Sequence, residues 1–440
     1  MGGRALEAVH ERMLLEEIAD ALTLHALAST VNETNFLEAV VVRALEVLLD
    51  HRQDVAWLKA VQIDRVLDLD DHDVVVAHGR SILHGVLLSS AQMTSLVMEM
   101  GARMPAPVHR TAYRAQQFGV LLNCLAGHRL IRFLTRVQVH PSKRALLEVH
   151  RRYRELIETD LRNVEEGLYP KQLLFQFPFV DYLKAVPSLA LDFPRTLRRM
   201  RRNAYEDLPR DVDLSRYPPY FRRTFHWQTD GYFSKRSASL YDVGVEFLFL
   251  GTADVMRRQV IPPITRMVRR EGDGIRVLDL GCGTGRTLLQ MAIAHPRLRY
   301  YGLDLSPYYL QHARELLHDV EHLSLLAENA EAVPLTDGYF DAVTSVHLFH
   351  ELPSPARRNV YREMFRLLRP GGLLVIEDSG QPSDSGELSF FLSNFSQEFH
   401  EPFHRDYMRD DIADALRETG FDVESSRAHF VSKVVIARKP

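Results

Sequence analysis

The clearest chemical signal in the sequence is a glycine-rich turn between an apolar run and a helical pattern. The run 277–280 is apolar apart from Asp279, and Gly281, Gly283 and Gly285 follow it at alternate positions. Glycine permits a tight turn and lets a ligand approach the backbone closely. A glycine triplet alone is weak support for a binding site, but this one stands in the strand–turn–helix context that nucleotide sites require. The turn therefore predicts a site for a nucleoside-containing ligand.

A second acid, Asp304, follows Gly285 by nineteen residues and ends the next predicted strand. A carboxylate in this place can accept hydrogen bonds from both ribose hydroxyls of a bound nucleoside. The alternative is a purely structural aspartate that caps the helix beginning at Ser306 and Pro307. The glycine turn upstream favours the binding role.

The elements that must position these residues alternate between strands and helices from about residue 214 onward. Short apolar runs predict strands, and helical segments separate them, which is typical of right-handed βαβ units in a mostly parallel sheet covered on both faces. The last two strands are joined by a short turn, so we expect the sheet to end in an antiparallel pair. The predicted strands are 276–280, 300–305, 322–326, 340–346, 372–378, 421–425 and 430–437, and the predicted helices are 286–295, 307–318 and 354–369.

This part of the chain resembles the class I S-adenosylmethionine-dependent methyltransferases, in the large group related to the ubiquinone and menaquinone biosynthesis methyltransferases. Four segments carry the resemblance in the family's order, and together they are highly specific. They are the acid and glycine motif 279–285, the acid Asp304, the segment 327–335 with Phe340-Asp341-Ala342-Val343 after it, and Leu368-Arg369-Pro370-Gly371-Gly372. The resemblance implies an α/β fold with a Rossmann-like, doubly wound, seven-stranded sheet, methyl transfer as the activity and S-adenosylmethionine as the cofactor.

The resemblance also implies which residues bind the cofactor. Asn329 stands where family members usually carry aspartate beside the adenine. Its side-chain oxygen can still accept a hydrogen bond from the adenine amino group, although without a charge. Ala330 can offer its backbone N–H to a ring nitrogen. The expected cofactor-binding residues are Asp279, Gly281, Cys282, Gly283, Gly285, Asp304, Leu305, Asn329, Ala330, Val346 and Tyr241.

A phosphate-containing dinucleotide is the competing ligand for such a fold. The spacing here is Gly-x-Gly-x-Gly rather than Gly-x-Gly-x-x-Gly, and Asp279 would repel a pyrophosphate. The same carboxylate suits the positively charged amino group of S-adenosylmethionine, directly or through water. Electrostatics therefore favours the methyl donor.

The residues after the fourth strand are the catalytic candidates, because ligands bind beyond the carboxyl ends of parallel strands. Methyl transfer is an in-line attack on a sulfonium, so the enzyme mainly aligns the nucleophile, and a base is needed only if the acceptor must lose a proton. His350 can supply that base with Glu351 orienting it, and His347 is the third candidate. The alternative is that the two histidines start a helix or pack in the interior.

Two aromatic-rich segments accompany the expected site. In related methyltransferases the segment before the glycine motif folds over the cofactor, so Tyr232 and Tyr241 are expected at the methionine end or in the acceptor pocket. After the fifth strand, the phenylalanines in 390–403 suggest a lid for an apolar or aromatic acceptor. Ordinary packing is the alternative for both segments. His400 and His404 would share a helix face, but no glutamate general-base motif accompanies them, so we expect no metal site.

The composition is that of an ordinary globular protein. Of 440 residues 46% are hydrophobic, and 54 basic against 58 acidic residues leave a net charge of −4. This balance argues against nucleic-acid wrapping as the main role.

Cys124 and Cys282 are the only cysteines, which excludes a disulfide framework and a cysteine-rich zinc site and fits a reducing cytoplasm. No secretory signal or membrane-length apolar run is visible, so we expect a cytoplasmic protein, with peripheral membrane contact left open.

The first part of the chain does not share the resemblance. Residues 1–168 show helical periodicity, with helices expected near 14–27, 33–48, 81–102, 109–137 and 142–166. In 169–213 prolines occur too often for one long helix, which predicts a connector of short helices. The expected domains are therefore a helical part (1–168), a connector (169–213) and a methyltransferase part (214–440). The helical part can form a homodimer, contribute to the acceptor pocket or bind a partner.

The expected function is methyl transfer from S-adenosylmethionine to a small, hydrophobic or aromatic acceptor. One alternative is a scaffold that binds the cofactor without turnover. The other is a methyltransferase placed on a macromolecular or membrane target by the arginines in 195–202, which can equally form a solvated helix face.

Overall fold

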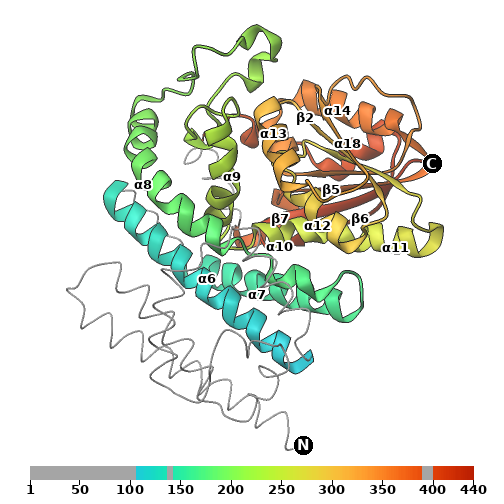
Figure 1. Ribbon diagram of the computed structural model, residues 1–440, viewed down its shortest axis with the longest axis horizontal. Helices are drawn as coiled ribbons and strands as arrows, with labels where there is room; N and C mark the ends of the chain where they lie inside the picture. The colour runs from blue at the N-terminus through green and yellow to red at the C-terminus, as the bar shows by residue number, and fades with distance from the viewer. Residues whose placement is uncertain (1–105, 136–141, 389–399) are drawn as a thin grey trace, which may run out of the picture. The chain divides into compact units, whose positions relative to one another are not determined.

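The described part of the chain is built on a seven-stranded sheet with helices on both faces (Figure 1). The computed structural model describes residues 106–135, 142–388 and 400–440, all within one compact unit. The strand order is β3-β2-β1-β4-β5-β7-β6, in which β1 to β5 are parallel and β7 is antiparallel to both β5 and β6. The expected sheet is therefore confirmed, with its antiparallel C-terminal pair. The strands are β1 (Arg276–Leu280), β2 (Arg299–Asp304), β3 (Leu323–Ala327), β4 (Phe340–Val346), β5 (Leu368–Ser379), β6 (Asp422–His429) and β7 (Ser432–Arg438).

Successive side chains of the strands pack against two different helical layers. Val277 of β1 and Tyr300 of β2 belong to one apolar cluster, whereas Leu278 and Leu280 belong to another. Successive side chains of a strand point to opposite faces of the sheet, so this alternation means that both faces are buried. The first cluster includes α11 (Ile261–Glu271), α12 (Arg286–Ala294) and α13 (Pro307–Leu316), and the second includes α14 (Ser354–Leu367) and α18 (Ile412–Thr419).

Strand β5 is longer than the sequence predicted. It begins at Leu368, which pairs with Phe340, and the next pair of this ladder joins Ala342 to Leu373. The residues 369–372 therefore form an irregularity within the strand rather than a turn before it. A bulge of this kind adds residues to one strand without ending its pairing.

Four longer helices precede the sheet: α6 (Ala106–Thr135), α7 (Lys143–Glu165), α8 (Phe179–Arg202) and α9 (Lys235–Leu248). The first two confirm the helices expected at 109–137 and 142–166. Helix α7 begins where Ser142 caps it, because the Ser142 hydroxyl accepts a hydrogen bond from Ala145 N–H at 3.0 Å. The expected helices at 14–27, 33–48 and 81–102 lie outside the described residues.

Helix α8 corrects the prediction of short helices in the connector. It runs without interruption through Pro187 and Pro194. Each proline removes one helical hydrogen bond, a cost that tertiary contacts can outweigh. The buried Arg199 supplies such contacts, because its guanidinium donates to Trp227 O at 2.6 Å and to Thr229 Oγ1 at 3.2 Å.

A buried polar cluster connects α6 and α7 to the segment that leads into the sheet. Asp160 accepts hydrogen bonds from Arg258 at 2.6 and 3.0 Å, and from the hydroxyls of Tyr113 and Tyr169 at 2.5 Å each. Arg258 and Asp160 are almost completely buried, so each charge depends on the other.

Among the described residues, the helices are too short or too polar to span a membrane.

Several short elements complete the described chain. They are α10 (Ala253–Arg257), α15 (Pro382–Ser385) and α17 (His404–Tyr407), with the 3-10 turns η2 (Lys171–Phe175), η3 (Leu214–Arg216), η4 (Pro219–Phe221), η5 (Phe225–Trp227), η6 (Arg258–Val260), η7 (Phe349–Glu351) and η8 (Gly386–Leu388).

Candidate functional site

The glycine turn connects the end of β1 to the start of α12. Gly281, Gly283 and Gly285 have positive φ angles of 77°, 53° and 83°, a region that favours glycine. A Cβ at Gly285 would lie 2.8 Å from Cδ1 of Leu317, whereas a Cβ at Gly283 would meet nothing within 4 Å. Close packing therefore requires glycine at 285, while the backbone at 283 borders open space.

Asp304, at the end of β2, holds this turn in place. Its Oδ2 accepts a hydrogen bond from Gly283 N–H at 2.9 Å, and its Oδ1 accepts one from Ser306 N–H at 2.8 Å. The aspartate thus supports both the turn and the start of α13, yet each oxygen keeps a lone pair for another donor. Burial outweighs these hydrogen bonds and raises the pKa of Asp304 to about 6.

Asp279 lies deeper in the same site and is only 1% exposed. The Thr344 hydroxyl, from the neighbouring β4, donates to Asp279 Oδ1 at 2.7 Å. Burial, with a smaller contribution from repulsion by Asp304, raises the pKa of Asp279 to about 7. A buried and a half-buried acid with little compensating charge suit a positively charged ligand.

Helix α9 reaches the glycine turn through Asp242. The Thr284 hydroxyl donates to Asp242 Oδ1 at 3.0 Å, and Arg257 pairs with the same oxygen at 3.4 Å. One residue earlier, the half-buried Tyr241 packs edge-to-face on Tyr309 of α13, with 5.4 Å between ring centroids. Tyr232 contacts both tyrosines. The segment before the glycine motif is therefore attached to the turn, with an aromatic cluster beside it.

The other expected cofactor-binding residues lie around the same strand ends. Cys282 is buried, and its backbone N–H donates to Leu303 O at 3.0 Å. The side-chain oxygen of Asn329 accepts from Glu331 N–H at 3.0 Å, so it already orders its own loop. Leu305, Ala330 and Val346 are half-buried.

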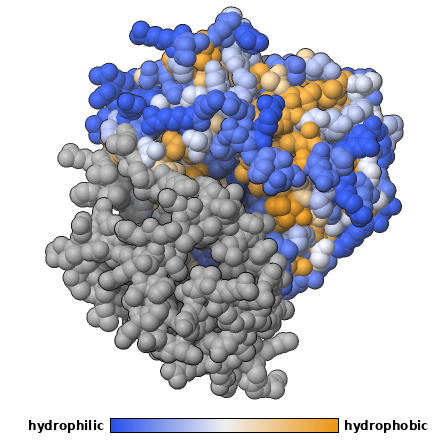
Figure 2. All heavy atoms as spheres, in the orientation of Figure 1, coloured by the Kyte–Doolittle hydropathy of each residue, from blue (hydrophilic) through white to orange (hydrophobic). Residues whose placement is uncertain are grey.

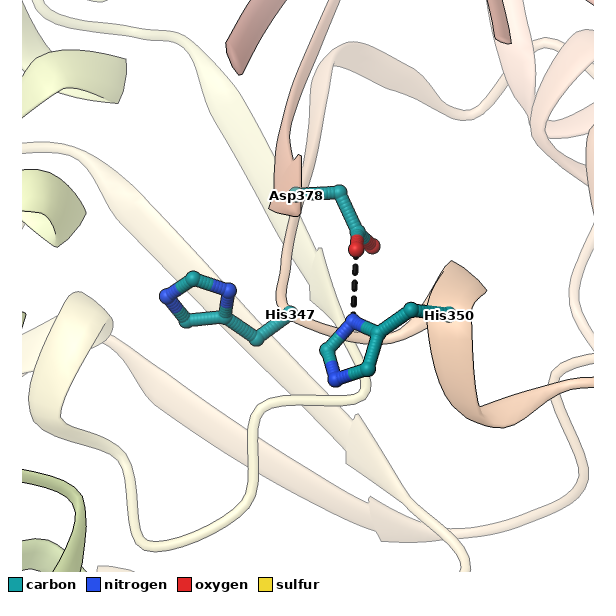
Figure 3. Close-up of side chains that lie close together, drawn as sticks. All are labelled: His347, His350 and Asp378. Atoms are coloured by element: carbon teal, nitrogen blue, oxygen red, sulfur yellow. Dashed lines mark hydrogen bonds and ion pairs between the residues drawn. The ribbon is translucent and has the colours of Figure 1, made fainter. Parts of the chain in front are cut away.

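Histidines and acids form a buried cluster at the carboxyl ends of β4 and β5. His350 Nδ1 hydrogen-bonds Asp378 Oδ1 at 2.6 Å, and the ring of His347 lies beside this pair (Figure 3). We expected Glu351 to orient His350, but Asp378 takes that place. Glu351 Oε1 instead accepts from the Tyr232 hydroxyl at 2.5 Å and pairs with His226 Nε2 at 3.0 Å.

The electrostatics of the two candidate histidines, His347 and His350, differ. Burial disfavours a charged His350, but Asp378 and Glu401 outweigh burial and raise its pKa to about 10. Burial and the neighbouring His350 lower the pKa of His347 to about 3. At neutral pH His350 therefore holds a proton, whereas His347 is neutral and only a weak base.

Sequence reasoning missed four residues of this cluster: His226, Glu377, Asp378 and Glu401. The adjacent acids 377 and 378 end an apolar strand, a signal that could have identified them. His226 and Glu401 stand far from the strand ends in sequence, and only the fold brings them together, with His226 Nδ1 and Glu401 Oε1 3.1 Å apart.

The expected lid is only partly described. Phe390, Phe391, Phe395 and Phe399 lie outside the described residues. His400 and His404 do not share a helix, because α17 begins only at His404. His400 stacks on Tyr205, with 5.0 Å between ring centroids, and His404 Nε2 lies 3.1 Å from Ser379 Oγ.

The arginine run at the end of α8 divides into exposed and buried side chains. Arg195, Arg198, Arg201 and Arg202 are exposed, whereas Arg199 is buried in the contacts given above. The visible surface around α8 and the loop after it is mostly hydrophilic (Figure 2). This pattern is that of a helix with one packed and one solvated face.

Comparison with known proteins gives a family for the region that contains the glycine turn. Residues 277–372 match the family described as "Methyltransferase domain". A demethylmenaquinone methyltransferase from Listeria welshimeri is 35% identical over 125 residues, 28% of this chain and 52% of that protein. The ubiquinone/menaquinone biosynthesis C-methyltransferase UbiE from Yersinia enterocolitica is 31% identical over 149 residues, 33% of this chain and 57% of that protein.

The chain thus spans about half the length of the curated relatives it matches. Among solved structures, an S-adenosylmethionine-dependent methyltransferase from Aquifex aeolicus is 20% identical, with a TM-score of 0.31 over 40% of this chain and 88% of that one. Residues 277–372 thus match a methyltransferase domain, and they lie in the seven-stranded sheet expected of the class I S-adenosylmethionine-dependent methyltransferases.

Proposed function

We propose that this protein transfers a methyl group from S-adenosylmethionine to a small, hydrophobic or aromatic acceptor. The observation that carries the proposal is the pair of acids at the glycine turn, the buried Asp279 and the half-buried Asp304. The named activities of the quinone-related relatives support an aromatic small molecule as the acceptor class.

The residues of the turn fit this cofactor. When bound, S-adenosylmethionine supplies an electrophilic methyl group on a sulfonium. Asp279 would face its ammonium group, because an ionised carboxylate at this buried place lacks a full counter-charge. Asp304 would hold the ribose hydroxyls with the lone pairs that Gly283 and Ser306 leave free. The glycine at 283 leaves room for close approach to the backbone.

We propose that the acceptor approaches from the ends of β4 and β5. His347, His350 and Glu351 lie there and would position the acceptor, since His350 already holds a proton and His347 is a weak base. Tyr232 and Tyr241 supply an apolar wall whose hydroxyls stay protonated, because burial raises the pKa of both well above the ordinary tyrosine value. Such a wall suits a planar, hydrophobic acceptor.

The test combines binding with transfer. Calorimetry of the purified full-length protein should detect both S-adenosylmethionine and S-adenosylhomocysteine, and a labelled methyl donor should mark a small molecule in an organic extract of cells. Asp304→Ala should lose the binding heat, whereas Asp319→Ala, at a side chain that is 91% exposed, should keep it. Absence of binding heat for both S-adenosylmethionine and S-adenosylhomocysteine in the wild-type protein would refute the proposal.

The same assay separates the two alternatives. Donor binding without a labelled product favours a non-catalytic scaffold. Label in protein, nucleic acid or a membrane fraction favours a macromolecular or membrane-associated target, which the exposed arginines of α8 would contact. Salt-sensitive binding to anionic vesicles, lost when Arg198 and Arg202 become alanine, would identify the membrane. The division into helical part, connector and methyltransferase part stays a prediction, as does a homodimer through residues 1–168.

A further inference from the structure

Three side chains of the histidine and acid cluster are placed as ligands of one metal ion. One potential ligand atom from each of His347, His350 and Asp378 lies within 4.8 Å of the other two. The side chains come from the carboxyl ends of β4 and β5, where Figure 3 shows them together. Ligand atoms at these separations can reach a common ion at about 2.0–2.2 Å after small side-chain shifts.

The second nitrogen of each imidazole faces a buried carboxylate. His347 Nε2 lies 3.3 Å from Glu377 Oε2, and His350 Nε2 lies 3.7 Å from Glu401 Oε2. His347 Nδ1 is therefore left for an ion beside Asp378, and an ion bound at His350 Nδ1 would replace the proton that this atom shares with Asp378. Metal-bound histidines typically donate their other ring N–H to a carboxylate, which fixes the ring and strengthens the ligand. Each ring here has a carboxylate near its second nitrogen, at 3.3 Å for His347 and 3.7 Å for His350, which a small shift would bring to hydrogen-bond distance.

The two glutamates beside the rings have few partners: Glu377 lies near His347, and Glu401 lies near His226 and His350. Glu377 is 0% exposed, and neither of its oxygens has a well-formed hydrogen bond. Glu401 is 1% exposed, and the same holds for both of its oxygens. A buried carboxylate without hydrogen bonds costs several kcal/mol, so these two glutamates would gain from a metal ion that holds the neighbouring rings as N–H donors toward them.

We propose that His347, His350 and Asp378 bind a divalent first-row transition-metal ion, with Glu377 and Glu401 as hydrogen-bond acceptors for the two imidazoles. Two imidazoles and one carboxylate suit Mn²⁺, Fe²⁺, Co²⁺ or Zn²⁺, whereas Mg²⁺ and Ca²⁺ prefer sets of oxygen ligands. Three protein ligands leave coordination positions open, as in metal sites that bind a substrate.

The position of the ion next to the glycine turn suggests its use, and this consequence rests on the proposed function. Leu348, between the two histidines in sequence, lies 3.1 Å from where a Cβ of Gly281 would be. An acceptor oxygen bound to the ion would therefore be held near the methyl-donor site. A divalent ion also lowers the pKa of a bound hydroxyl, which prepares it to act as a nucleophile.

Metal binding can be measured without any assay of activity. The full-length protein is stripped with a chelator, dialysed and titrated with Co²⁺, whose visible absorption bands report coordination by nitrogen and oxygen ligands. We expect one Co²⁺ per chain, a higher melting temperature with the ion, and much weaker binding of Mg²⁺. His347→Gln and Asp378→Asn should each weaken Co²⁺ binding by at least 10–100-fold, the loss typical of even an outer-shell partner.

A matched control and a milder variant keep the test decisive. His295→Gln removes a half-buried histidine that hydrogen-bonds Thr265 elsewhere in the fold, and it should leave Co²⁺ binding unchanged. Glu377→Gln keeps the side-chain shape and should weaken Co²⁺ binding about 10-fold even if the ligand variants fail to fold. Far-UV circular dichroism checks the fold of each variant.

The outcomes separate this inference from the proposed function. No absorption band and no rise in melting temperature in the stripped wild-type protein would overturn the metal site, as would Mg²⁺ binding more tightly than Co²⁺. Co²⁺ binding that His347→Gln and Asp378→Asn leave intact would also overturn it. Metal binding without methyl transfer would refute the proposed function alone, whereas methyl transfer by a protein that binds no Co²⁺ would refute the metal site alone.

Discussion

Replacing Asp279 with asparagine should make the ligand-free protein more stable and its ligand binding weaker. The carboxylate is 1% exposed and accepts a hydrogen bond from Thr344 Oγ1 at 2.7 Å. Burial raises its pKa from 3.8 to about 7, so the folded protein disfavours the ionised form. Asparagine keeps the shape and can still accept the Thr344 hydrogen bond, but it carries no charge.

The sign and size of the stability effect follow from proton linkage. Between pH 4 and pH 7 the folded protein holds a proton on Asp279 that the unfolded chain has released, so wild-type stability falls as the pH rises through this range. At 1.36 kcal/mol per pKa unit, the rise from 3.8 to about 7 corresponds to a loss of about 4 kcal/mol. The asparagine variant lacks this loss, so its advantage over the wild type should grow up to pH 7 and then stay constant.

The effect on ligand binding has the opposite sign. A ligand with an ammonium group favours the ionised carboxylate, so wild-type affinity should increase with pH up to about 7. A hydrogen bond to a charged group contributes about 1.5–3 kcal/mol, so Asp279→Asn should weaken binding by roughly 10–100-fold above pH 7. The variant should also lose most of the pH dependence of binding.

Urea unfolding followed by circular dichroism at pH 5, 6, 7 and 8 measures the stability, and calorimetry with S-adenosylhomocysteine at the same pH values measures the affinity. Asp319→Asn, at a side chain that is 91% exposed, controls for the loss of an acid as such. A stability difference that stays constant from pH 5 to pH 8 would show that Asp279 ionises normally. Unchanged affinity in the variant would exclude Asp279 from the binding site.

Three further changes test the turn and the packing around it. Asp304→Asn should weaken S-adenosylhomocysteine binding by roughly 10–100-fold in calorimetry, because it removes the charge from the side chain that accepts from Gly283 N–H. A change under threefold would contradict a role of Asp304 in ligand binding. Arg258→Met leaves the Asp160 carboxylate buried without its cation and should lower the free energy of unfolding in urea by about 3–5 kcal/mol. An effect below about 1 kcal/mol would show that this ion pair does not stabilise the fold. Gly285→Ala should lower the melting temperature, because residue 285 has a φ of 83° and the new Cβ would lie 2.8 Å from a methyl carbon of Leu317. Gly244→Ala, inside α9 with nothing within 4 Å of the new Cβ, should instead stabilise the protein by about 0.5–1 kcal/mol. Equal effects at both sites would refute the packing argument.

The methyltransferase sheet was predictable because its signals are local. Strands β1 and β4 are short, mostly apolar runs, and their burial on both faces leaves little polar alternation to confuse the pattern. The bounds of β1 and β4 match the predicted ranges 276–280 and 340–346. The connector was less predictable, since the cost of Pro187 and Pro194 is local but the contacts of Arg199 that oppose it are distant.

The cluster at the ends of β4 and β5 shows the same limit. His347 and His350 could be chosen from sequence because they follow a strand that ends at the binding edge. Their charge states could not, because these depend on Asp378 and Glu401, which approach from other elements. The expected pairing of His350 with Glu351 was wrong for this reason: adjacent residues at a turn point in different directions.

The sequence by itself determined the order of strands and helices, the glycine turn and the two acids, since these depend on residue types at short spacing. Only the tertiary structure decided which charges are buried together, and hence which carboxylates and imidazoles hold protons. The reason is physical: backbone conformation and apolar periodicity are properties of neighbouring residues, whereas desolvation and Coulomb interaction depend on whatever the fold brings within a few ångströms.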